Sequence, residues 1–159
     1  METILQKPLF RLSEKTKDLI VDIIIYIFLA LFIYTAASKF QTQDGFEKIL
    51  RRSPLTGSYS SFISWSVPIS ETIISFLLLI PSTKRIGLYA SLAIMVIFTC
   101  FLIYGILVGS RLPCHCGGVI SSLSWKQHIW FNLLFIAAAI TGIKLKYNKD
   151  FTRVKQGKP

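Results

Sequence analysis

Four long apolar segments, separated by short polar stretches, dominate the pattern of this chain. A lipid hydrocarbon core about 30 Å thick is crossed by roughly 20 apolar residues in helical conformation. Backbone polar groups must be satisfied inside lipid, so segments of this length are expected to be helices rather than strands. Four segments meet or approach this membrane-crossing length: residues 19–37, 62–80, 86–109 and 125–143. The pattern therefore predicts an all-α membrane protein, a bundle of four transmembrane helices over residues 19–143.

Two shorter patterns lie between these segments. Residues 44–50 place Phe46, Ile49 and Leu50 at helical spacing, which predicts a short amphipathic helix on the outer membrane face, with a mobile loop as the alternative. Ser124 and Gln127 stand at capping-box spacing, so their side chains can satisfy each other's backbone donors as the fourth helix begins.

Charge adds an orientation to this picture. Hydrophobic residues make up 52% of the 159 positions and charged residues only 16%, with a net charge of +10. Twelve Lys and Arg residues fall on the face that carries both termini, and six fall on the other face. The positive-inside rule then predicts cytoplasmic basic tails at residues 1–18 and 144–159, with the loop between the last two spans outside. The positive charge is thus attributed to topology and to anionic lipid, and not to nucleic acid.

That outer loop carries candidate chemistry, the run PCHCGG at residues 113–118. In extended chain the Cα atoms of Cys114 and Cys116 lie roughly 7 Å apart, at the limit for a disulfide, so a bond between them requires a tight turn. Such a bond would be strained, and strained, exposed disulfides are the labile ones. A protonated His115 between them favours the thiolate, which is the nucleophile. These features favour a redox-active pair.

Two other roles for this loop stay open. The cysteines can form a structural staple, or they can join His115 and His128 as soft ligands for Cu(I) or zinc. Adjacent ligands on one tight turn suit a tetrahedral site poorly, and no second Cys pair completes it, so no metal is assigned. Cys100, deep in the third span, is expected to be a small buried hydrophobe.

Glu71 is the second anomaly, because it lies at the midpoint of the second apolar segment. An ionised carboxylate there costs about 2.5–3.5 kcal/mol or more. Counted in depth, Glu71, Cys100 and Asn132 fall near one level, with Tyr104 and His128 nearer the surface. We expect a shared polar cluster in which Glu71 either carries protons for thiol or quinone chemistry or is a hydrogen-bonded packing residue.

Several of these residues together resemble the DoxX/MauE family of small four-helix membrane proteins. The resemblance extends over residues 19–143 and rests on Ser38-Lys39-Phe40, the stretch around Phe46, Glu71 after Pro68, the Cys-rich turn, Trp125 and Asn132. It is closest to the methylamine-utilisation MauE branch, whose members commonly carry Cys-x-Cys followed by glycine in this loop. The usual Cys-Gly-Cys-Phe-Gly-like turn here reads Cys114-His115-Cys116-Gly117-Gly118.

The resemblance implies a bacterial inner-membrane protein that handles disulfides in exported partners, as in the maturation of a disulfide-rich amine dehydrogenase subunit. Cys114 and Cys116 would exchange electrons with an exported thioredoxin-like or disulfide-containing protein, assisted by His115 and Glu71. The sequence names no cofactor and carries no quinone motif, and a quinone stays open as the acceptor. The alternatives are a non-enzymatic scaffold for an exported complex and a metal-handling membrane protein.

Overall fold

The computed structural model describes residues 13–107 and 124–155, and these residues form helices without a β-strand. Four helices are long: α1 (Glu14–Gln41), α3 (Ser60–Leu79), α4 (Lys84–Leu107) and α5 (Trp125–Lys155). A short helix α2 (Gln43–Arg52) and a 3-10 turn η1 (Gly57–Tyr59) connect α1 to α3. Within the described residues, four helices are long and apolar enough to cross a membrane. The predicted all-α, four-helix membrane architecture is confirmed.

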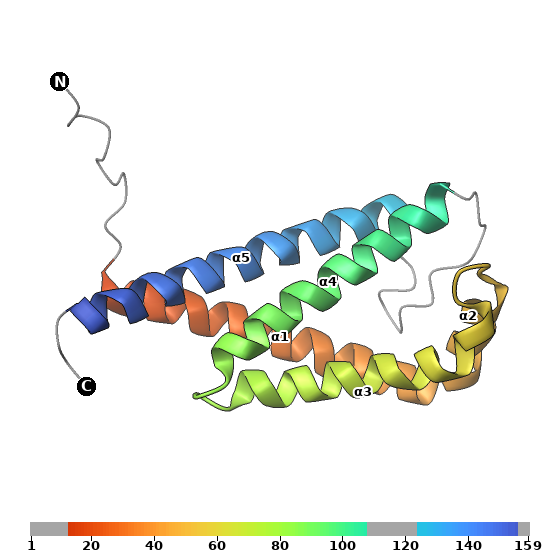
Figure 1. The fold of residues 1–159 in the computed structure, drawn as a ribbon, viewed down its shortest axis with the longest axis horizontal. Coiled ribbons are helices and arrows are strands. Elements are labelled where there is room, and N and C mark those ends of the chain that lie inside the picture. Colours follow the sequence, from red (N-terminus) through yellow and green to blue (C-terminus); the bar gives the residue numbers. More distant parts are fainter. Residues whose placement is uncertain (1–12, 108–123, 156–159) are drawn as a thin grey trace, which may run out of the picture.

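The four long helices form a bundle in which neighbours in sequence are neighbours in space. Helix α1 packs against α3 and α5, and α4 packs against α3 and α5, which closes a ring of four. Helix α2 covers one end of the bundle, here called the α2 end, where α1 ends, α3 begins, α4 ends and α5 begins (Figure 1). The start of α1 and the end of α5 lie at the opposite end (Figure 1).

Each long helix contributes one buried stripe to the core. The aromatic centre joins Phe28 and Phe32 of α1 to Phe135 of α5, and the Phe28 and Phe135 ring centroids are 5.2 Å apart in an edge-on arrangement. Gly87 of α4 allows close approach to α3, because an added Cβ would lie 2.9 Å from Leu78 Cδ2. Many large apolar side chains on the outer faces are exposed, as expected of a surface that contacts lipid.

Both short patterns expected from the sequence are present. Helix α2 buries Phe46 and Leu50 against the bundle, so the amphipathic stretch is helical rather than irregular. At the start of α5, the Ser124 N–H donates to Gln127 Oε1 at 2.8 Å, and the Gln127 N–H donates to Ser124 Oγ at 3.4 Å. The reciprocal cap fixes the residue at which α5 begins.

Two helices are longer than the apolar segments that predicted them. Helix α1 continues past residue 37 to Gln41, so Lys39 belongs to the helix and not to a loop. Helix α5 continues past residue 143 to Lys155, into the basic tail. Hydropathy detects where a segment stops being apolar, whereas helical hydrogen bonding continues until a residue or contact ends it.

Candidate functional site

A buried ion pair joins α1 to α3 inside the bundle. Lys39 Nζ lies 2.7 Å from Glu71 Oε1, and the exposed fractions of the two side chains are 2% and 3%. A charge inside a membrane-spanning segment is expensive unless it faces the bundle interior and is paired. The pair therefore accounts for the carboxylate in the middle of an otherwise uncharged apolar segment.

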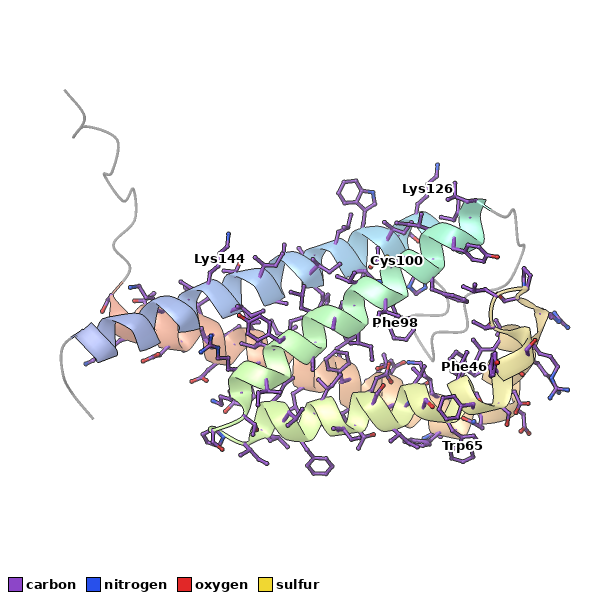
Figure 2. The ribbon with its side chains drawn as sticks, viewed as in Figure 1. Phe46, Trp65, Phe98, Cys100, Lys126 and Lys144 are labelled. Atoms are coloured by element: carbon purple, nitrogen blue, oxygen red, sulfur yellow. The ribbon has the colours of Figure 1, made fainter. Side chains whose placement is uncertain are left out.

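Lys39 reaches this position because it continues the buried stripe of α1. Phe28, Phe32, Thr35 and Lys39 are all buried and follow one another at helical spacing. A lysine near the end of a membrane helix usually extends its ammonium outward to water, but here the side chain extends inward. The ammonium also lies 5.5 Å from the centroid of the Phe98 ring, a cation–π contact that partly replaces lost hydration. Phe98 projects from α4 toward α3 (Figure 2).

Glu71 lines a partly open cavity of about 50 Å³, here called the polar cavity. Within the described part of the chain, Glu71 Oε2 is buried and makes no hydrogen bond. The polar side chains that line the cavity come from three helices, and are Thr35, Lys39, Glu71, His128 and Asn132. Its apolar lining consists of Leu31, Phe32, Met95, Phe98, Leu102 and Phe131.

The α5 side of the polar cavity is set by the cap at Ser124 and Gln127. His128 lies one residue beyond that cap and donates its backbone N–H to the Ser124 carbonyl at 3.0 Å. Asn132 follows four residues later, on the same face, and both side chains are buried. His128 and Asn132 therefore line the polar cavity from the first turns of α5.

A second polar contact lies nearer the α2 end. Gln43 Nε2 donates to Ser64 Oγ at 2.9 Å, and the Thr56 hydroxyl donates to the Leu50 carbonyl at 2.8 Å. Pro68, between Ser64 and Glu71, lacks the N–H that would bond to the Ser64 carbonyl. A hydrogen bond thus joins α2 to α3 near the α2 end, and the Lys39–Glu71 pair joins α1 to α3 deeper in the bundle.

The predicted polar cluster is present in part. Glu71, Asn132 and His128 meet at the polar cavity as expected. Cys100 does not, and the expectation that it is buried is wrong, because it is an exposed free cysteine on α4. Tyr104 is not among the lining residues. Lys39 was missed because it was counted as a basic residue of the outer loop.

The residues Cys114, His115 and Cys116 lie outside the described residues, as do residues 1–12 of the N-terminal tail. The segment that contains the cysteines joins Leu107, the last residue of α4, to Ser124, the cap of α5. Both attachment points are at the α2 end, within about two helical turns of the cavity residues Leu102 and His128. Among the described residues, no group of three His, Cys, Asp or Glu side chains could hold a metal.

A family model described as methylamine utilisation protein MauE matches residues 17–145. This range includes most of α1, all of α2, α3 and α4, and the part of α5 that lines the polar cavity. A search of curated proteins and a search of solved structures each gave no match.

Proposed function

The chain belongs to the MauE family of methylamine utilisation proteins, and from this membership we propose that it supports thiol–disulfide exchange in the maturation of exported proteins. Cys114 and Cys116 are the exchanging residues in this proposal. The partner is an exported protein that carries a disulfide or a thioredoxin-like dithiol. The protein acts as an integral protein of the bacterial inner membrane, with the cysteine segment on the outer side.

One observation supports this function above the alternatives: the cysteine segment is attached at both ends beside the polar cavity. Its flanking helices α4 and α5 both contribute side chains to that cavity, together with Glu71 and Lys39. A membrane scaffold stapled by a loop disulfide has no need of a buried carboxylate with an unbonded oxygen at a cavity that α4 and α5 also line. Proton-coupled thiol chemistry does use such a group.

The exchange needs no reactant beyond the two proteins. The thiolate of one cysteine attacks a sulfur of the partner's disulfide, forms a mixed disulfide and releases one partner thiolate. The second cysteine then attacks the mixed disulfide, forms the Cys114–Cys116 bond and releases the other partner thiolate. Two electrons pass from the cysteine pair to the partner, and the protons lost by one dithiol are taken up by the other. The reverse sequence oxidises the partner.

His115 and Glu71 assist the proton movements in this proposal. His115 lies between the two cysteines in sequence, so its imidazole can accept a thiol proton and then favour the thiolate. Glu71 lies deeper and keeps one carboxylate oxygen free of protein hydrogen bonds. Lys39 holds the other oxygen in place and is a positioning residue for this carboxylate.

The proposed orientation rests on the distribution of Lys and Arg along the sequence. Twelve of these residues fall on the face that carries both termini and six on the other face. This bias favours cytoplasmic termini.

We expect a thiol reagent that cannot cross membranes to label reduced Cys114 or Cys116 from outside intact cells. The experiment uses a Cys100→Ser background, because Cys100 is also exposed on the protein surface. A Cys114→Ser, Cys116→Ser variant in that background is the unlabelled control. Labelling that requires the inner membrane to be opened would place the cysteine segment in the cytoplasm and reverse the topology.

Thiol trapping across a redox titration tests the exchange itself. For the purified full chain with Cys100→Ser, we expect Cys114 and Cys116 to oxidise together in one two-electron step. The ratio of oxidised to reduced protein should then change tenfold for each change of about 30 mV in the ambient potential. The midpoint should lie above about −300 mV, since structural disulfides have lower potentials. A disulfide that resists reduction at that potential would favour the staple. Thiols that react only after a chelator is added would favour a metal site.

A further inference from the structure

The unbonded oxygen of Glu71 requires a partner that the described side chains do not provide. Glu71 Oε2 is buried and has no hydrogen-bond partner among the described residues. A buried carboxylate oxygen in this state loses the free energy of its hydration, and no protein hydrogen bond compensates for that loss. Besides Lys39, the Thr35 hydroxyl lies close enough to interact with the carboxylate. That hydroxyl already donates to the Phe32 carbonyl at 3.3 Å.

The size and lining of the polar cavity identify the chemical class of the missing partner. One water needs about 10–15 Å³ of such space, so a cavity of about 50 Å³ can hold a few waters. Cavities lined only by apolar groups stay dry. Most of the surface of this cavity is apolar, but Thr35, Glu71, His128 and Asn132 from three helices also line it and offer polar groups to water. A ring-sized organic molecule needs about 150 Å³, as judged from a benzene-binding cavity.

We propose that the polar cavity is a hydrated proton-exchange site in which water bridges Glu71 Oε2 to Asn132 and His128. The inference deepens the role of Glu71 in the proposed function, but the hydration and proton exchange of this carboxylate do not depend on the cysteines. Lys39 keeps Oε1 occupied, so the proton is exchanged at Oε2.

The step balances in atoms and charge without electron transfer. A proton passes from hydronium, or from the imidazolium of His128 through water, to Oε2, and leaves water or neutral imidazole behind. The Lys39–Glu71 pair gains one positive charge when it takes up the proton and loses it on release. Among the described residues, the charged and titratable groups at the cavity are Lys39 of α1, Glu71 of α3 and His128 of α5, while α4 contributes Met95, Phe98 and Leu102.

Infrared difference spectroscopy of the full chain in lipid nanodiscs tests this site. On acidification we expect the carbonyl stretching band of a protonated carboxylic acid that is present in the wild type and missing in Glu71→Gln. After transfer to D₂O the band should shift to lower frequency, because deuterium replaces the carboxyl proton through water, and the rate of this shift reports the rate of proton exchange. Asn132→Leu, which replaces a polar lining group with an apolar one, should slow that shift by about tenfold, the effect of one lost buried hydrogen bond.

A matched pair of isosteric variants serves as control and as a second test. Thr35→Val removes a hydroxyl beside Glu71, and Thr141→Val makes the same change on an exposed part of α5. We expect Thr35→Val to slow the deuterium shift and Thr141→Val to leave its rate unchanged. If Asn132→Leu does not fold, this comparison still tests whether polar groups of the cavity control proton exchange at Glu71.

Two results would overturn the proposal. One is the absence of any acid-induced band that depends on Glu71, and the other is an exchange rate that is the same in wild type, Asn132→Leu and Thr35→Val. Either result would leave thiol–disulfide exchange untouched, since the measurement involves no cysteine. A failed redox titration would likewise leave the hydrated site standing.

Discussion

Replacement of Lys39 with methionine is expected to lower the free energy of unfolding by about 3–5 kcal/mol, because it leaves the buried Glu71 carboxylate without its cation. Methionine preserves the length and apolar stem of the side chain, so the loss reports on the ammonium and not on packing. Denaturant titration of the protein in mixed micelles, followed by helix content, measures the change. Lys48→Met, the same substitution on the exposed face of α2, should change the free energy by no more than about 0.5 kcal/mol.

The double variant Lys39→Met, Glu71→Leu separates an unpaired charge from a general loss of structure. Replacing both members of a buried ion pair with apolar residues is often neutral, so we expect this variant to recover most of the stability lost in either single variant. Glu71→Gln should be milder than Glu71→Leu, since the amide oxygen can still accept a hydrogen bond from Lys39. Additive losses in the double variant, or a Lys39→Met loss no larger than that of Lys48→Met, would contradict a coupled pair.

The membrane architecture was predictable because lipid imposes a strong and simple constraint. A run of about 20 apolar residues has to be a helix, and four such runs gave the four long helices with their order. Local chemistry was predictable for the same kind of reason: Ser124 and Gln127 form the expected cap, and Phe46 and Leu50 the expected buried face. These features depend on residues close together in sequence.

The ion pair was missed because it depends on residues 32 positions apart. Lys39 looked like the polar end of an apolar segment, and its charge was counted in the outer loop. Two signals in the sequence could have identified it. Glu71 in mid-membrane calls for a buried cation, and Lys39 follows Phe28, Phe32 and Thr35 at helical spacing on one face of α1.

Cys100 shows why faces are hard to assign within membrane helices. In a water-soluble helix, polar residues mark the exposed side, but lipid is as apolar as the core of the bundle. Almost every residue of α4 around Cys100 is apolar, so the sequence contains no contrast between inside and outside. The expectation of burial therefore rested on residue type alone, and the structure places Cys100 on the exposed face.

Serine substitution of Cys114 or Cys116 is the change expected to affect function most. Each variant should abolish the proposed thiol–disulfide exchange, because in that exchange one cysteine attacks and the other must resolve the mixed disulfide. Stability should change little, since a loop closed by so few residues removes only about 1.6 kcal/mol or less of chain entropy. A staple instead predicts a mild and symmetric loss of stability with function kept, and a metal site predicts equal loss of bound metal in both variants.

Capture of the mixed disulfide is the measurement that tests the proposed exchange most directly. Cys114→Ser and Cys116→Ser, each with Cys100→Ser, are expressed in cells, quenched with acid and alkylated, and separated on non-reducing gels. We predict that one of the two variants forms a reductant-sensitive adduct with an exported protein and that the other does not. The absence of an adduct in both variants, with maturation of exported proteins unimpaired, would contradict thiol–disulfide exchange by this protein.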